Sequence, residues 1–365
     1  MGVGKKMQQK ILSIQVVRAI AFILVFLSHV ELISTGPLGV SLFLVLSGFC
    51  MTYSYLDRPE KIPQPCFLNN LRFAWGKIKK LYPLHFVTLL FVALIVFGGL
   101  FINRGPIKEI AEQSVYFIAN SLLLQSWIPC RDGYYSFNAV SWYLSTSAFS
   151  YFLFPWVFRF IQSKDKKKIV TLTSVTLGLM VMIAFTLEIG QSCYGITREF
   201  VKWAVYIFPF YRSGDFIIGL LTGYFFVTNK KPDGKVQQTF AQIVILCMTC
   251  AVIFAYNEDL LRSTSFALDL IWLPLSVACI YLFGINEGRL SKVLSSSKWP
   301  IMIGNVSGEA FLVHHICIKA SEAVSCNKII IAGIAFVLTF TCIYIWNVLK
   351  RTYHVLVDHH HQFLH

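Results

Sequence analysis

Two ionisable side chains, Arg18 and His29, lie within one long apolar segment, residues 11–33. A separation of eleven residues is about three helical turns, so a helix presents both side chains on one face, about 16 Å apart along its axis. A charged side chain inside a membrane span costs roughly 2.5–3.5 kcal/mol, which makes each one a functional hypothesis. A cation and a titratable base on one stripe predict a polar pore that holds a long polar ligand. The alternative is an arginine that snorkels to the membrane surface and a histidine satisfied within the core.

Arg212 and Asp215 form a second polar pair within an apolar segment. Their spacing of three residues allows them to pair on one helical face. The pair either positions a ligand or is a neutralised structural couple. Trp142 opens another apolar segment, where it either lines the pore or anchors the helix at the membrane interface.

A third group, Glu309, His314 and His315, lies in the apolar segment 300–320. Adjacent helical residues point in different directions, so at most one of these two histidines is expected to line the same cavity as His29. We regard Glu309 and His314 as candidate pore-lining or positioning residues. No cluster of cysteine or carboxylate side chains argues for a metal, so we predict no metal site.

Composition indicates which elements position these residues. Of 365 residues, 56% are hydrophobic and only 14% are charged, whereas roughly a quarter are charged in soluble domains. Long apolar runs with few charges are typical of helices that span a bilayer. The sequence therefore predicts an all-α polytopic membrane protein of about ten transmembrane helices, a single domain over residues 1–365 without a separate soluble domain. The predicted spans are residues 11–33, 37–56, 81–102, 140–162, 169–189, 203–227, 239–256, 266–285, 300–320 and 328–350.

The basic residues indicate an orientation. Lysine and arginine gather in the segments that share a side with the N-terminus, and few lie on the other side. This bias predicts that both termini are cytoplasmic. The two longest loops are then 57–80, which is cytoplasmic and basic, and 103–139, which is external and contains a semi-apolar stretch suited to an interfacial or re-entrant helix. The lysines lie in short loops between spans, so a nucleic-acid partner is not expected.

Several motifs follow one another along the chain. The first is Arg18, ten residues and then His29, and the second is Gly39-Val40, an apolar run and Ser47-Gly48-Phe49. They are followed by KIKKLYP, which contains Lys77 and Lys80, by SWYLSTSAFSYFLFP, by YRSGDFIIGLL and by GNVSGEAFLVHH. In type and order these motifs resemble the acyltransferase 3 family of integral membrane acyltransferases, which act on bacterial surface carbohydrates.

The sequence departs from the family pattern at several positions. Lysine stands at 77 and 80, where the family often has arginine, and lysine lacks the bidentate fork for phosphate. Many members carry a glutamate at the position of Ser147, so its role is either absent here or supplied elsewhere, with Glu309 as a candidate. Asp215 stands where glutamate is common.

The resemblance implies an O-acyltransferase that moves an acyl group from cytoplasmic acyl-CoA to a hydroxyl of a cell-surface or lipid-linked glycan. Acetyl is the expected acyl group, lipopolysaccharide or exopolysaccharide the expected acceptor, and the bacterial inner membrane the expected location. His29 would act as general base, with an acyl-histidine intermediate as the competing route. Arg18 would stabilise developing charge or orient the CoA arm. The donor phosphates would bind Lys77, Lys80 and Arg72, unless that basic loop only sets orientation.

The implied partners are the lipid bilayer, acyl-CoA and a carbohydrate acceptor. No permanently bound cofactor is expected, because acyl-CoA is a substrate. A competing hypothesis is a transporter or flippase for a polar or lipid-linked solute, which predicts inverted repeats and broken helices that the sequence does not display. A second hypothesis keeps the enzyme and replaces acetyl by succinyl or another acyl group. A third is a structural or sensing membrane protein, which leaves the Arg18–His29 stripe unexplained.

Overall fold

The computed structural model describes residues 11–162, 165–230, 234–262 and 264–363, with side chains described up to residue 353 and excluding that of residue 166. Every regular element in these ranges is helical, which confirms the all-α prediction. The N-terminal residues used to predict the orientation lie outside them. The α-helices are α1 (Leu12–His29), α2 (Gly36–Tyr55), α3 (Phe67–Ile78), α4 (Tyr82–Ile102), α5 (Ile107–Ser121), α6 (Arg131–Tyr134), α7 (Trp142–Gln162), α8 (Lys166–Cys193), α9 (Arg198–Lys202), α10 (Pro209–Thr228), α11 (Lys235–Asn257), α12 (Trp272–Ile285), α13 (Arg289–Ser296), α14 (Lys298–Glu322) and α15 (Lys328–Phe363). Short 3₁₀ helices are η1 (Pro59–Lys61), η2 (Gln125–Trp127), η3 (Ala139–Ser141) and η5 (Ser265–Leu268), and η4 (Trp203–Ile207) is π-helical.

Nine segments of the described chain are long and apolar enough to cross a membrane. They match nine of the ten predicted spans. The tenth, predicted over 140–162, is helix α7, which is 21 residues long but contains buried serine and threonine side chains at 145, 146, 147 and 150. These hydroxyls face the bundle interior, so α7 is long enough to span and yet less apolar than its neighbours.

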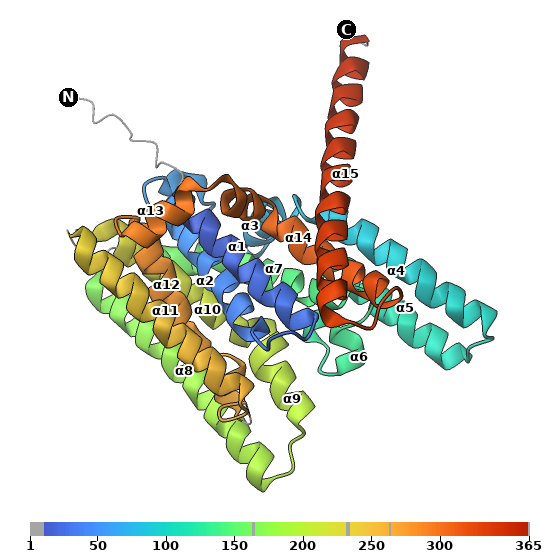
Figure 1. Cartoon of the computed structure of the whole chain (residues 1–365), viewed down its shortest axis with the longest axis horizontal. Helices are drawn as coiled ribbons and strands as arrows, with labels where there is room; N and C mark the ends of the chain where they lie inside the picture. Colours follow the sequence, from blue (N-terminus) through green and yellow to red (C-terminus); the bar gives the residue numbers. More distant parts are fainter. Residues whose placement is uncertain (1–10, 163–164, 231–233, 263, 364–365) are drawn as a thin grey trace.

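The membrane-spanning helices fall into two groups according to the buried share of their most apolar window. In α2, 72% of the most apolar window is buried, and in the segment that contains α10 the value is 83%, whereas α4, α8, α11 and α15 reach only 17–22%. The core therefore runs along α2 and α10, with α1, α7, α12 and α14 packed around it. The less buried helices form the periphery (Figure 1), where apolar side chains suit contact with lipid.

Glycines permit the close approach of α2 and α10. A β-carbon at Gly48 would collide with the carbonyl oxygen of Phe216, and one at Gly219 would collide with the carbonyl oxygen of Val45. Small residues at such crossings let helix backbones touch, which is how helices associate in lipid without a hydrophobic driving force. The glycines of two sequence motifs therefore determine how closely the central helices pack.

Two regions predicted as loops contain helices. Half of the predicted loop 57–80 is α3, an amphipathic helix whose Asn70 donates to the Phe152 carbonyl oxygen of α7 at 2.8 Å. The helix also exposes the large apolar side chains of Phe67 and Trp75, as in a helix that lies in the membrane interface. The predicted external loop 103–139 contains α5, η2 and α6, and α5 pairs with α4. Helix α3 was missed because it is too short and too polar to span, whereas α5 overlaps the semi-apolar stretch that was expected to form an interfacial or re-entrant helix.

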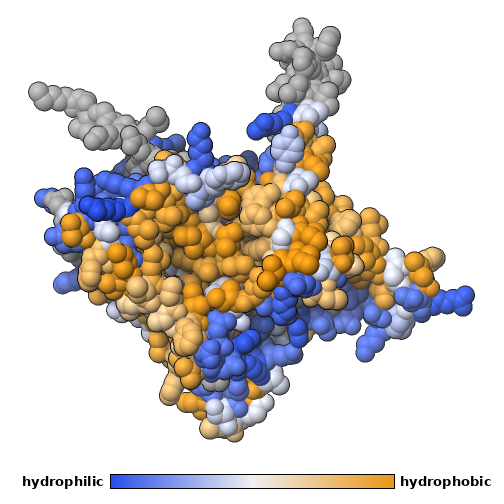
Figure 2. Space-filling view, in the orientation of Figure 1, coloured by the Kyte–Doolittle hydropathy of each residue, from blue (hydrophilic) through white to orange (hydrophobic). Residues whose placement is uncertain are grey.

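The molecule has two polar ends, which we name the α3 end and the α9 end. The α3 end contains α3, α13 and the start of α1, and the α9 end contains α9 and the turn after α1 (Figure 1). Figure 2 shows apolar side chains across the middle of this view and hydrophilic ones gathered towards the two ends. This is the surface of a protein whose middle lies in hydrocarbon.

Adding one methyl group at Gly219 tests how closely α2 and α10 pack. We expect Gly219→Ala to lower the unfolding midpoint in detergent, because overpacking costs about 1–3 kcal/mol and exceeds the roughly 1 kcal/mol that alanine gains in helix propensity. Gly178→Ala on α8 is the control, since a β-carbon there meets nothing within 4 Å. Equal midpoints for the two variants would contradict the close crossing.

Candidate active site

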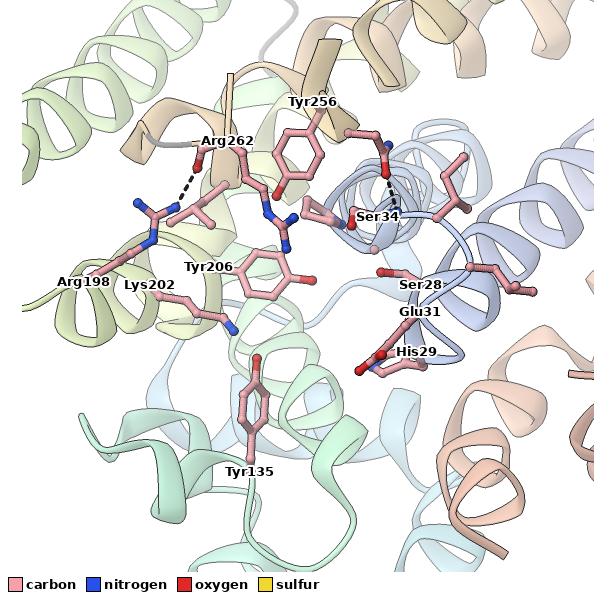
Figure 3. A pocket seen from close by; sticks show the side chains of 16 residues that line it. Ser28, His29, Glu31, Ser34, Tyr135, Arg198, Lys202, Tyr206, Tyr256 and Arg262 are labelled. Carbon is pink, nitrogen blue, oxygen red and sulfur yellow. Dashed lines mark hydrogen bonds between the residues drawn. The ribbon is translucent and has the colours of Figure 1, made fainter. Parts of the chain in front are cut away.

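His29 is the last residue of α1 and lies at the α9 end, where the chain turns into α2. A cavity of about 580 Å³ opens beside it, which we call the outer cavity (Figure 3). Tyrosines and cations from other elements complete its wall. The lining residues are Ser28, His29, Glu31, Leu32, Ile33, Ser34, Gly36, Pro37, Tyr135, Arg198, Lys202, Tyr206, Tyr256, Asn257, Arg262 and Leu268.

A chain of hydrogen bonds fixes the tautomer of His29. Nδ1 of His314 lies 2.8 Å from the carbonyl oxygen of Phe311, which only accepts, so this nitrogen carries a proton. The other nitrogen of His314, Nε2, is then an acceptor, and it lies 3.2 Å from Nδ1 of His29. Nδ1 of His29 also lies 2.9 Å from the Val25 carbonyl oxygen. It must therefore be the donor to both acceptors, which leaves Nε2 of His29 with its lone pair.

This arrangement gives His29 the protonation pattern of a base. A neutral imidazole with a proton on Nδ1 can accept a proton only at Nε2. The side chain of His29 lines the outer cavity, whereas His314 is fully buried. His314 thus orients the ring of His29 from behind, and the free electron pair belongs to the residue in contact with the cavity.

The two adjacent histidines of α14 both approach His29. The ring centroid of His314 lies 5.0 Å from that of His29, and the centroid of His315 lies 5.5 Å away. Neither α14 residue lines the outer cavity. His314 is enclosed by Phe22, whose ring is 5.8 Å away, and by Phe26 at 6.2 Å.

Arg18 lines a different cavity, of about 250 Å³, which we call the inner cavity. Its guanidinium lies 3.5 Å from the sulfur of Cys50. Two tyrosines of α7, Tyr143 and Tyr151, share the wall, and the hydroxyl of Tyr151 bonds to that of Ser47 at 2.8 Å. Ser47 thus faces the inner cavity, while its neighbour Gly48 makes the helix crossing.

Three aromatic rings separate the two cavities. Phe311 and Phe43 pack with centroids 5.7 Å apart, and Tyr143 lies 4.9 Å from Phe311. All three line the inner cavity, and the Phe311 ring lies 5.7 Å from His314, which in turn contacts His29. The predicted polar pore is therefore two cavities divided by an aromatic cluster, Phe43–Tyr143–Phe311.

The structure also locates Ser147, the position where the resemblance implies a glutamate in many family members. Ser147 lies one turn from Tyr143 and one turn from Tyr151, so the three residues share one face of α7, and its side chain is buried. Glu309, the candidate substitute, pairs with Lys350 of α15 at 2.7 Å and lines neither cavity. Glu309 is therefore engaged in helix packing rather than in replacing the carboxylate.

The predicted pair of Arg212 and Asp215 is confirmed, with 3.0 Å between the charged atoms. The sequence did not indicate that Asp269, just before α12, pairs with the same guanidinium. All three side chains are fully buried. The guanidinium carbon also lies 5.6 Å from the ring of Tyr206, so this buried triad supports the wall of the outer cavity.

Trp142 lies inside the bundle rather than at its rim. Only 4% of its surface is exposed, and its ring lies 5.2 Å from that of Tyr206. The interface-anchor alternative is therefore wrong, and Trp142 supports a cavity-lining tyrosine.

The candidate donor-binding residues lie on and just after α3, in two environments. The ammonium of Lys77 is 4.4 Å from the Tyr55 ring and 5.1 Å from the Phe73 ring, and it bonds to the Tyr55 hydroxyl. Arg72 and Lys80 are exposed to solvent. Lys80 directly precedes Leu81, which lines the inner cavity.

Several residues of the outer cavity were missed by sequence reasoning. Arg198 and Lys202 come from α9, Tyr206 from η4, and Tyr256 and Arg262 from the end of α11 and the turn after it. Each lies in or near a connection, where polar residues are ordinary. No spacing pattern joins these segments, and only the fold brings them together.

A family profile and two curated relatives match this chain. The acyltransferase 3 profile, described as an acyltransferase domain, matches residues 11–350. Acyltransferase MdmB of Streptomyces mycarofaciens is 30% identical over 128 residues, which is 35% of this chain and 30% of that protein. Regulator of hypoxia-inducible factor 1 of Caenorhabditis elegans is 24% identical over 220 residues, which is 54% of this chain and 42% of that protein. The chain thus spans less than half the length of these curated relatives, and no solved structure matches it.

The buried triad leads to a stability prediction. We expect Asp269→Ala to lower the free energy of unfolding by about 3–5 kcal/mol, because it leaves the buried Arg212 guanidinium short of a partner. Asp259→Ala is the control. Asp259 also pairs with an arginine, but 76% of its side chain is exposed, so we expect a loss of about 0–1 kcal/mol. Denaturant titration of the detergent-purified protein measures both, and similar losses would show that Arg212 does not depend on Asp269.

Proposed function

The chain belongs to the acyltransferase 3 family, and from that premise we propose that it transfers an acetyl group from acetyl-CoA to a hydroxyl of a cell-surface or lipid-linked glycan. The observation that carries this proposal is the tautomer of His29. Its proton on Nδ1 is engaged by Val25 and His314, so that its basic Nε2 is available at the wall of the outer cavity.

The charge distribution supports an orientation in a bacterial inner membrane with the α3 end in the cytoplasm. Basic residues are concentrated at that end, on η1, α3, α13 and the start of α14: Arg58, Lys61, Arg72, Lys77, Lys79, Lys80, Arg289, Lys292 and Lys298. The positive-inside bias makes such an end cytoplasmic. Acyl-CoA would then enter from the α3 end, and the glycan would enter the outer cavity.

The inner cavity fits the thin pantetheine arm of the donor. Arg18 provides a cation that orients the arm or stabilises the developing charge of the thioester carbonyl. To reach His29 the thioester has to pass the Phe43–Tyr143–Phe311 cluster, which lies against His314. Rotation of these rings would open the route only while a donor occupies it.

The chemistry at His29 then follows from its lone pair. As the acceptor hydroxyl attacks the thioester carbonyl, its proton passes to Nε2 and a carbon–oxygen bond forms. The carbon–sulfur bond breaks, and the departing thiolate of CoA recovers the proton from His29. In the competing route Nε2 itself attacks the carbonyl, and the carbon–sulfur bond breaks to release the thiolate of CoA. The hydroxyl then takes the acyl group as the nitrogen–carbon bond breaks, and its proton passes to that thiolate.

Transfer of label from acetyl-CoA tests the role of His29. Membranes that contain the chain receive labelled acetyl-CoA, and label on surface polysaccharide is measured. We expect His29→Gln to lower the rate about 10²–10⁴-fold, the usual contribution of a general base. We expect His314→Gln to cost less, about 10²-fold at most, because the base remains and only its orientation is lost.

His85→Gln is the matched control. His85 is a buried histidine away from both cavities, and its Nε2 lies 3.0 Å from the carbonyl oxygen of Asn120, a contact that the glutamine amide can replace. Labelling at the wild-type rate by His29→Gln would remove His29 from the chemistry. Absence of label with the wild type would count against acetyl as the group transferred.

Donor binding gives a separate prediction. We expect the double variant Arg72→Gln/Lys80→Gln to raise KM for acetyl-CoA several-fold and to reduce its salt dependence, with kcat unchanged, because exposed cations attract the donor phosphates. Lys61→Gln/Lys79→Gln removes the same charge from the same end of the molecule and is the control. If both double variants raise KM equally, the effect is general attraction rather than a site.

A further inference from the structure

The outer cavity has an excess of positive charge. Among the residues that the structure describes, its wall contains three cations, Arg198, Lys202 and Arg262, and one carboxylate, Glu31. Figure 3 shows Arg198 and Lys202 on the side opposite His29, with Tyr206 and Tyr135 towards the middle of the view. A neutral sugar needs no such charge, and cations in a cavity attract anions.

The carboxylate of the wall is already committed. Glu31 pairs with Lys328 at 3.0 Å, a residue that does not line the cavity. The hydrogen bond from Lys328 lowers the pKa of Glu31, so this carboxylate is ionised at neutral pH. Arg262 has its own loose partner, Asp259, at 3.7 Å. Arg198 donates to the backbone carbonyl oxygen of Arg262 at 2.6 Å, and Lys202 is the third cation of the wall.

Lys202 has no carboxylate partner at ion-pair distance among the described residues. Its ammonium lies 5.4 Å from the centroid of the Tyr135 ring, and Figure 3 shows it pointing into the space between Tyr135 and Tyr206. Burial raises the pKa of Tyr135 well above its ordinary value, so this phenol stays neutral and does not balance the charge. The side chain of Lys202 is half-buried, and a cation in that position favours an anionic ligand.

The rest of the wall suits a sugar ring. Tyr135, Tyr206 and Tyr256 offer flat apolar faces that end in hydroxyl groups. Asn257 is held by the backbone N–H of Ser34 at 2.9 Å, which fixes the turn that follows His29. The cavity volume of about 580 Å³ falls within the range of small-molecule sites.

We propose that the acceptor carries an anionic group, either the carboxylate of a sugar acid or a phosphate, and that Lys202 holds this group while a hydroxyl of the same molecule meets His29. The proposal rests on the function proposed above and adds the chemical class of the acceptor. Lys202 and His29 line opposite sides of the outer cavity in Figure 3, so fixing the anion at one side directs the far end of the sugar towards the base.

Binding can be measured without any acyl donor. The probes are D-glucuronate, glucose 1-phosphate, glucose and dihexanoyl phosphatidylglycerol, each titrated into the detergent-purified full chain at constant ionic strength. The unfolding midpoint reports binding, because a ligand that binds only the folded state raises it. We expect at least one of the two anionic sugars to bind at least about tenfold more tightly than glucose, a difference of about 1.4 kcal/mol. The stronger of the two identifies a carboxylate or a phosphate as the group held.

Variants of Lys202 and of a control lysine show whether the preference for anionic sugars depends on Lys202 or on the overall charge of the protein. We expect Lys202→Met to abolish the preference for anionic sugars and Lys202→Arg to retain it. Lys319→Met is the control, because Lys319 is an exposed lysine that pairs with Glu322 and lines no described cavity. Should Lys202→Met lower the starting midpoint, the comparison of glucuronate with glucose within that variant still decides the result.

Three outcomes would overturn the inference: equal binding of glucose and both anionic sugars, a preference that survives Lys202→Met, or binding of phosphatidylglycerol alone, which would make the ligand a lipid headgroup. The inference and the proposed function fail separately. Anion selectivity without acetyl transfer would overturn the function, and acetyl transfer that depends on His29 without anion selectivity would overturn only the inference.

Discussion

The hydrogen bond between His29 and His314 joins two helices that are distant in the sequence, and the site depends on it. It forms because α1 and α14 approach each other closely, and a β-carbon at Gly304 of α14 would collide with the carbonyl oxygen of Gln15. In a bilayer every polar group has to find its partner inside the protein. The two imidazoles and the carbonyl oxygens of Val25 and Phe311 meet that requirement together, and they leave one basic nitrogen over.

The family motifs therefore combine two kinds of residue within a few positions. In the Ser47-Gly48-Phe49 stretch the serine hydroxyl contacts Tyr151 in the inner cavity, while the glycine makes the crossing with α10. In the motif that contains Asp215, the aspartate belongs to a buried charge triad, and Gly219 packs against α2. In both motifs the polar residue lies close to the glycine that permits the helix crossing, and the crossing holds the polar side chain in place.

The difference between contacts within one helix and contacts between helices explains how much could be predicted from the sequence. Residues on one helix were predictable, because helical geometry alone relates them: the pairing of Arg212 with Asp215 is an example, and so are the apolar spans. Partners on different helices were not. Asp269 has no spacing relation to Arg212, yet it binds the same guanidinium. Helix α7 was identified, but its serines gave no sign that they line the interior rather than weaken a span. The cavity-lining Lys202 resembles an ordinary residue of a connection until α9 is placed against the turn after α11.

If the donor and the acceptor approach from opposite sides of a membrane, as proposed above, the aromatic cluster between the cavities meets a requirement of such an enzyme. A continuous aqueous pore past Arg18 and His29 would admit water to the thioester and dissipate the ion gradients of the membrane. The rings of Phe43, Tyr143 and Phe311 pack against one another at the wall of the inner cavity, where they would close that path. Because Phe311 also contacts His314, displacement of this ring by an arriving donor would reach the residue that orients the base. Under the proposed function, the route of the donor and the orientation of His29 would then be coupled through the Phe311 side chain.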